Sequence, residues 1–441
     1  MLKQVIHSLY YAIIPILILG IIRGYSTFTI SIVLLLPLIL TTNRHTLALF
    51  FIMYGGPLAG VTRSIYPIIP IYGLILNFIG LILIWDLIID LLRNNIHSFW
   101  GMLVVLALFG FFYIIGPMDQ FSTQKYLNLC LHGLMMLFAY YCLERSANID
   151  VEALTRILLI TAICMYAYVI NAEGITPGGY FDFNWFRDQS LVFFRANDHA
   201  GSLVDYQHIG MLLLFSIAVY LSQSRLNLTL TTYYLACASY MILVSGCRQA
   251  IFGAALLITL RSIVFRVQNF NNKNDVGRFL WIGIGLMGAS LLFLIVFRVL
   301  GSDVVTRTLT EGDAARISFY RSAVSIFQQN PVTGIGLGGF HDITGSVYPH
   351  NMFFELLCET GLLGVVASLV LLSKPLMIVQ QGLLHLTGSS LFYFLIVLAI
   401  FVRVMVSSDL TESIELFSAV FAIQSVQFYI DEPNYHDYSG D

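Results

Sequence analysis

Apolar runs about as long as a membrane-spanning helix recur along almost the whole of this chain. A helix needs about 20 mainly apolar residues to cross a bilayer, and 58% of the 441 residues are hydrophobic whereas only 11% are charged. Backbone polar groups cannot stay unpaired in lipid, and the runs lack the alternation of barrel strands, so helices are expected. The sequence therefore predicts an all-α, polytopic transmembrane helix bundle.

About fourteen spans are predicted within a single integral membrane domain, 1–441. Two longer segments between spans, 172–205 and 300–350, are expected to form long external loops. No small-residue cleavage site follows the first apolar run, so we expect that helix to be retained. The spans lie near residues 5–22, 26–42, 46–61, 66–90, 98–115, 126–143, 152–171, 206–223, 228–245, 248–265, 279–299, 351–372, 389–406 and 413–430.

Basic residues predict the orientation of the bundle. The connector at 261–278 carries the strongest basic cluster of any short loop, so it is expected to face the cytoplasm. Counting spans outward from it puts both termini inside. The short outer connectors then hold only Arg23, Arg63, Lys125, Arg248 and Arg403.

The second long loop is expected to contain a short amphipathic helix over 314–329. Asp313 is the predicted cap, and Asn330-Pro331 ends the helix. Tyr320 lies on its apolar side. Such a helix is expected to lie along the membrane surface.

Arginine is the basic residue of the two long external segments and their borders. Planar guanidinium groups suit bidentate phosphate contacts, so the outer face is expected to bind an anion. Ion pairs with nearby acidic side chains are the alternative, and both readings stay open for each arginine. Arg316 and Arg321 point about 140° apart on a helix, so they need a further element, such as the helix mouth at Arg248, to meet one anion. The six arginines are Arg187, Arg195, Arg298, Arg307, Arg316 and Arg321.

A glycine-rich run, TGIGLGGF at 333–340, follows the amphipathic helix. A backbone nest for phosphate and a tight turn at an interface are both open readings. The glycines follow a helix and not a strand, which excludes the nucleotide-binding fingerprints.

Pro349, His350 and Asn351 are expected to open a helix at the outer membrane boundary. An imidazole with an ordinary pKa of about 6.5 accepts a proton near neutral pH, and an amide can orient it or a substrate hydroxyl. An interfacial histidine without chemistry is the alternative. Glu355 and Glu359 share one face of this helix. Glu359, about 13 Å along the axis, is expected either to anchor an arginine in a wet cleft or to be a structural hydrogen-bonded group.

The first long loop mixes acidic, histidine and aromatic residues. Its possible metal ligands, which include Asp182 and His199, have no recognisable spacing, so no metal site is expected. Arg187 and Arg195 among aromatic residues predict a surface for a sugar chain or a lipid headgroup. The scattered cysteines indicate neither disulfides nor zinc, and no basic stretch with interleaved aromatics suggests nucleic acid.

The spacing after His350-Asn351 resembles a family signature. Nine residues lead to Gly361, and two more lead to Gly364. This is similar to the pattern of the O-antigen ligase and polymerase family: His, then Asn, Ser or Gln, nine residues, Gly, two residues, Gly. The order of SGCRQA, RISFYRSA and NPVTGIGLGGF is also similar to that family, and the resemblance covers about residues 195–370.

The resemblance implies a glycosyltransferase of a bacterial inner membrane that uses undecaprenyl-diphosphate-linked oligosaccharide, with both long loops and the active site in the periplasm. It implies no metal and no other cofactor. Membrane lipids, a chain-length regulator and a flippase are the expected partners. The implied catalytic residues are His350 and Asn351, the diphosphate-binding residues are Arg248, Arg316 and Arg321, and the supporting residues are Glu359, Tyr320, Arg195 and Arg187.

Two activities of this family differ only in the acceptor. A polymerase joins one lipid-linked repeat unit to another, and a ligase moves the glycan to lipid A-core. The predicted span count and the two arginine-bearing loops favour the polymerase. A flippase or a proton-coupled transporter is the alternative from another class, supported by His132 and Glu415 in predicted spans.

Overall fold

The structure is a computed structural model, and every element it describes is a helix. The predicted fold class is therefore confirmed for this part of the chain. The count of about fourteen spans extends over further residues and stays a prediction. The described residues are 43–53, 72–145, 149–172, 206–221, 231, 234–239, 242, 247–268, 302–385, 388–407 and 410–423.

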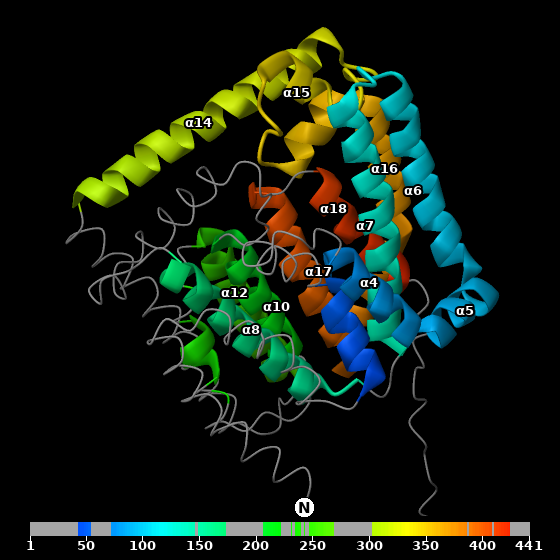
Figure 1. The fold of residues 1–441 in the computed structure, drawn as a ribbon, viewed down its shortest axis with the longest axis vertical. Coiled ribbons are helices and arrows are strands. Elements are labelled where there is room, and N and C mark those ends of the chain that lie inside the picture. Colours follow the sequence, from blue (N-terminus) through cyan, green and yellow to red (C-terminus); the bar gives the residue numbers. More distant parts are fainter. Residues whose placement is uncertain are drawn as a thin grey trace, which may run out of the picture.

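The helices form two groups that a single helix joins. In one group, α6 (Ile96–Ile114), α7 (Gln120–Arg145), α16 (Met352–His385) and α18 (Leu410–Ile423) pack together. In the other, α10 (Tyr206–Leu221) packs between α8 (Val151–Ala172) and α12 (Arg248–Gln268). Between them lies α17 (Gly388–Ser407), which contacts α10, α12, α16 and α18 (Figure 1).

Three helical stretches in the described part of the chain are long and apolar enough to cross a membrane: Ile96–Ile114, Gln120–Leu143 and Met352–Ser373. A bent pair, α4 (Tyr72–Leu83) and α5 (Trp85–Asn94), overlaps the described part of the span expected at 66–90, and its two parts are inclined at 64°. These helices and the family resemblance suggest an integral membrane protein.

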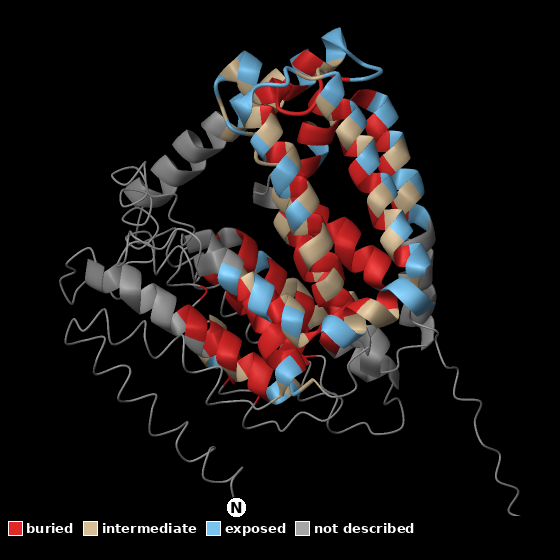
Figure 2. Ribbon diagram, turned by 45° about the vertical axis from the view of Figure 1, so that its right-hand side comes forward, coloured by how far each residue is buried: buried red, intermediate tan, exposed pale blue. Residues whose placement is uncertain are grey.

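The distribution of buried and exposed apolar side chains is the one expected for a helix bundle whose solvent is lipid. On α6, Phe109 and Phe112 are buried while Trp100 and Phe111 are exposed, so apolar side chains lie on the outside of the bundle as well as in its interior. Figure 2 shows buried and exposed residues alternating along the outer helices. In a bilayer the exposed ones would face hydrocarbon. Ser418 of α18 shows how a polar side chain is accommodated inside the bundle: its hydroxyl lies 2.9 and 3.0 Å from the backbone oxygens of Gly133 on α7 and Ile414, and can donate its one proton to either.

Two helices lie at the end of the bundle where α6 gives way to α7 (Figure 1). These are α14 (Ser302–Gln329), which packs on α16, and the short α15 (Gly339–Thr344). The prediction of a short helix capped by Asp313 is wrong, because α14 begins a further eleven residues upstream and passes through that position without a break. Its end before Asn330-Pro331 is confirmed, since proline cannot continue the helical hydrogen bonds.

Candidate functional site: a histidine at the head of a broken helix

Helix α16 is broken at Gly361, whose φ of 61° and ψ of −164° are not helical. Past the break, the amides of Leu362 and Leu363 donate outside the helix, to the carbonyl oxygens of Pro331 and Val332 at 2.9 and 3.0 Å. The segment 352–360 is therefore a short helix of its own, which is joined to the rest of α16 through a left-handed residue.

The glycine-rich run fills this break. The amides of Ile335 and Gly336 donate to the carbonyl oxygens of Cys358 and Glu359 at 3.0 and 2.9 Å, so they take up acceptors that the interrupted helix leaves open. One residue later, the amide of Leu337 donates to a carbonyl of α6. Three successive amides thus have protein partners. This favours the tight-turn reading of the run over a phosphate nest.

Close backbone approach explains why glycine stands at these positions. A Cβ atom at Gly334 would lie 2.5 Å from the carbonyl carbon of Glu359, and one at Gly336 would lie 2.2 Å from the Cα of Gly116. Both residues also have positive φ, which a Cβ disfavours. Gly364, the last glycine of the signature, lies against the Thr360 side chain in the same way.

His350 stands two residues before the short helix and has a left-handed backbone, with φ of 61°. Non-glycine residues rarely adopt this conformation, and where it occurs it is often associated with function. The partly buried ring lies between Tyr348 and Phe319, at centroid distances of 4.4 and 5.7 Å. Its Nδ1 atom is buried and has no hydrogen-bond partner among the described residues.

Burial, and to a smaller extent the positive charge of Arg316 on α14, together lower the pKa of His350 to about 4. Both effects disfavour the imidazolium form. At neutral pH the ring is therefore uncharged and has one nitrogen lone pair with which to accept a proton.

Asn351 caps the short helix, as the predicted helix start requires. Its Oδ1 accepts from the amides of Phe353 and Phe354 at 2.9 and 3.2 Å, and its Nδ2 donates to the carbonyl oxygen of Met405 on α17 at 2.6 Å. The amide group thus ties the residue after His350 to a second helix. This arrangement fits orienting the histidine better than contacting a substrate.

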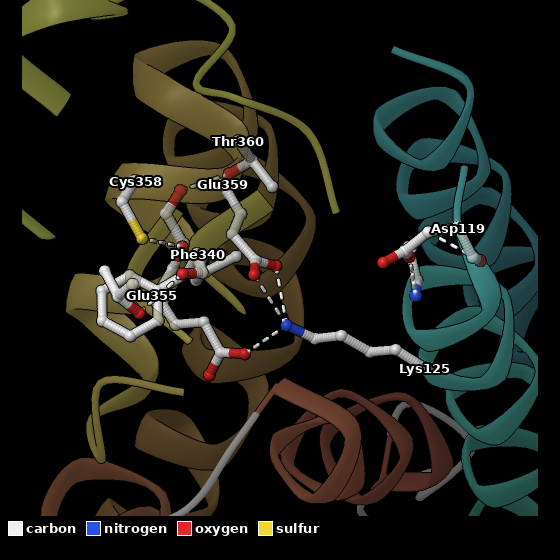
Figure 3. Close-up of polar contacts among 10 residues, drawn as sticks. Asp119, Lys125, Phe340, Glu355, Cys358, Glu359 and Thr360 are labelled. Carbon is white, nitrogen blue, oxygen red and sulfur yellow. Dashed lines mark hydrogen bonds and ion pairs between the residues drawn. The ribbon is translucent and has the colours of Figure 1, made fainter. Parts of the chain in front are cut away.

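Beneath His350, the two glutamates of the short helix share one partner. The Lys125 ammonium on α7 lies 2.6 Å from Glu355 Oε1 and 2.8 Å from Glu359 Oε2 (Figure 3). The glutamate side chains are fully buried and that of Lys125 is 4% exposed. The prediction that Glu359 anchors an arginine is wrong, because its partner is Lys125. The prediction that Lys125 lies in an outer connector is also wrong, because this residue lies in the second turn of α7.

The predicted arginines are only partly brought together. Arg316 is half-buried and acts on His350, while Arg321, five positions on, is exposed. Between them Tyr320 stacks on Phe354 of the short helix, with ring centroids 4.6 Å apart. Arg248 is the first residue of α12, but its side chain lies outside the described part of the structure, as do Arg187 and Arg195 altogether.

A second polar cluster lies on a cavity of about 350 Å³ whose lining includes residues of α7, α10, α17 and α18. On its wall, Arg403 pairs with Glu412 and Glu415 at 3.0 and 2.8 Å, and Tyr140 donates to Glu415. His132 lies on the same wall, and its Nε2 has no partner among the described residues. Arg403 thus lies within α17 and not in the connector where the sequence placed it.

The described part of the chain contains no group of three or more His, Cys, Asp or Glu residues that is placed to hold a metal ion. The acidic and histidine residues of the first long loop, 172–205, all lie outside that part.

Lys125 is the residue of the site that sequence reasoning missed. The sequence does contain a sign of this role. Two acidic residues four positions apart on an apolar helix need a cation, and a lysine near the start of another apolar helix can supply it. Which cation meets them depends on the packing of helices 230 residues apart in the chain.

Comparison with known proteins agrees with the sequence signature. Residues 210–369 match the family model described as O-antigen ligase, and this range includes His350, Asn351 and both glutamates. The resemblance inferred from the histidine and glycine spacing is thereby confirmed. No curated protein matches the chain.

Proposed function

We propose that this chain, whose residues 210–369 belong to the O-antigen ligase family, is a membrane glycosyltransferase that moves a glycan from a lipid diphosphate to an acceptor hydroxyl. The observation that carries the proposal is the setting of His350. An uncharged imidazole lies at the head of a short helix, beside a guanidinium group and within the matched range.

In this proposal His350 accepts the proton of the acceptor hydroxyl while the oxygen attacks the anomeric carbon from the face opposite the diphosphate. The bond from the anomeric carbon to the diphosphate oxygen breaks, and its electron pair leaves with the lipid diphosphate, so the configuration inverts. Arg316, whose charge acts on His350, is proposed to stabilise the departing charge. Arg321 and Arg248 are proposed to help, and Asn351, Tyr320 and Glu359 to support the segment that carries the base.

Binding of the donor is expected to make His350 a stronger base. A diphosphate near Arg316 would offset the positive charge that lowers the pKa of His350, so donor binding raises the basicity of the imidazole. The base then becomes stronger when the substrate it serves is in place. The carrier we propose is undecaprenyl diphosphate, in a bacterial inner membrane with the site facing the periplasm.

The family model carries the description of a ligase, which favours lipid A-core as the acceptor. The span-count argument for a polymerase stays a prediction. Purified protein incubated with lipid-linked repeat units alone, and then with lipid A-core added, separates the two. A ladder of longer lipid-linked products in the first mixture supports the polymerase, and transfer only in the second supports the ligase. No product in either contradicts the proposed function.

A transporter is the second candidate, and the cavity beside Arg403 is the observation that favours it. Ionisable groups inside a transmembrane bundle often line a transport path. Here, however, Arg403 has two acidic partners within 3.0 Å, so the cluster also has a structural explanation. The transporter would be favoured if the protein, reconstituted in proteoliposomes, moved lipid-linked glycan across the membrane and formed no transfer product.

A further inference from the structure

We propose that Lys125 is a positioning residue of the transfer site: by holding Glu355 and Glu359 it locks the short helix 352–360, and with it His350, against α7. The inference rests on the proposed function for its link to turnover. The lock itself is a statement about the fold and can be tested without activity.

The short helix needs such a lock because its C-terminal end is not continuous with the rest of α16. At Gly361 the intrahelical hydrogen bonds stop, and the amides of Leu362 and Leu363 bond to another segment. A helix of nine residues has little stability of its own. Its position is therefore decided by what it contacts.

Apolar packing from α14, where Tyr320 stacks on Phe354, covers one side of the segment. Hydrogen bonds to three further elements hold it as well, and they differ in strength. The glycine-rich run donates two backbone hydrogen bonds near its C-terminal end, and Asn351 reaches α17 at its N-terminal end. Between these ends, Lys125 makes three hydrogen bonds of 2.6 to 2.9 Å, all to charged oxygens (Figure 3). Hydrogen bonds between charged groups are about twice as strong as neutral ones.

The spacing of the two glutamates explains why one ammonium fixes the helix in two respects. Residues four apart lie about 6 Å from each other along a helix axis, so a group bonded to both opposes sliding along the axis. Both carboxylates lie on one face, so the same group also opposes rotation about the axis. Either movement would shift His350, which lies two residues before the helix and is joined to it through Asn351.

The burial of the cluster makes it sensitive to the removal of one partner. Breaking a buried ion pair typically costs about 3–5 kcal/mol, because the remaining charge is left uncompensated, whereas replacing the whole cluster by neutral groups of similar size is often tolerated. Lys125→Met alone therefore risks misfolding. The triple variant Lys125→Met/Glu355→Gln/Glu359→Gln removes the lock while leaving no uncompensated charge.

The matched control is Glu355→Gln alone. It leaves one ammonium facing one carboxylate, a neutral pair, and the new amide oxygen can still accept from Lys125. We expect this variant to keep the short helix in place. The triple variant is expected to fold, as judged by monodisperse elution and thermal unfolding, but to release the helix.

Two measurements test the lock. In hydrogen–deuterium exchange, the amides of 352–360 should exchange faster in the triple variant than in wild type or Glu355→Gln, while those of 102–112 on α6 stay unchanged. In the transfer assay, the triple variant should lose about tenfold to a hundredfold in kcat, because a misplacement near 1 Å costs on the order of 10²-fold, with KM for the lipid-linked donor little changed.

The pH dependence of kcat distinguishes displacement of His350 from a simple loss of folded protein. Among the described residues, Tyr348 packs on the ring of His350 and Arg316 acts on it through its charge, and burial helps to keep the ring neutral. A ring that leaves this pocket regains a higher pKa, so the acidic limb of kcat against pH should move to higher pH in the triple variant. A merely structural loss of folded protein would lower the whole profile without moving the limb.

Unchanged exchange over 352–360 overturns the proposal, and so does faster exchange with unchanged kcat and pH profile in an active protein. If the wild type shows no transfer, or if His350→Ala transfers normally, the proposed function fails. Even then the exchange result alone decides whether Lys125 locks the helix.

Discussion

The amide of Gly336 donates to the carbonyl oxygen of Glu359 at 2.9 Å, across the break in α16. The same glutamate holds Lys125 through its side chain. One residue therefore joins the glycine-rich run to the backbone of the short helix and joins that helix to α7. His350 lies at the far end of the segment that these bonds position.

His350→Ala should lower turnover by about 10²- to 10⁴-fold, the usual contribution of a general base. The ring contacts Tyr348 and Phe319, and its Nδ1 has no hydrogen-bond partner within the described part of the chain, so its loss should leave the fold intact. Turnover of lipid-linked donor measures the effect, and elution profile and thermal unfolding serve as controls. Near-normal turnover would remove His350 from the mechanism.

Arg316→Gln should move the acidic limb of kcat/KM to higher pH. Burial and the Arg316 charge both lower the pKa of His350, which is about 4, so removing the charge raises the pKa toward 6.5. Burial is the larger cause, so the shift should be partial. Arg321→Gln is the comparison: it lies on an exposed part of α14, and we expect it to raise donor KM without moving the limb. Equal shifts in both variants would contradict the pairing of Arg316 with His350.

Gly361→Ala should destabilise the protein far more than Gly345→Ala. Both glycines have φ near 60–70°, so alanine meets backbone strain at either site: about 1–2 kcal/mol in the left-handed conformation of Gly345, and more at Gly361, whose ψ of −164° belongs to a region that is essentially limited to glycine. At Gly345 nothing lies within 4 Å of the added Cβ, whereas at Gly361 it meets the Gly334 amide and the Val332 oxygen at 2.5 Å. Thermal unfolding of the two variants in the same detergent measures the difference. Similar unfolding temperatures would mean that the break is not closely packed.

Asn351→Ala should cost about 0.5–2 kcal/mol through loss of the helix cap, and more through loss of the bond to Met405. Asn351→Asp separates the two effects, because a carboxylate still accepts from Phe353 and Phe354 but cannot donate to the Met405 carbonyl. We expect the aspartate variant to be intermediate in unfolding temperature. If it matches the wild type in stability and turnover, the bond to α17 contributes nothing to placing His350.

The sequence by itself determined the helical class, the start of α16 after Asn351, the end of α14 before Pro331 and the family signature. Each of these depends on local chemistry: apolar length, a capping side chain, proline geometry and residue spacing. The true start of α14 was missed, because an aspartate that suits a helix start is also tolerated inside a helix.

Only the tertiary structure decided which groups meet. Spacing placed Glu355 and Glu359 on one face but not opposite Lys125, because that pairing depends on how α7 packs against α16. It also decided that the glycines close a broken helix, since the carbonyls they bond to belong to residues more than twenty positions away. Contacts between distant segments follow from three-dimensional packing, and the local pattern of a single sequence does not encode them.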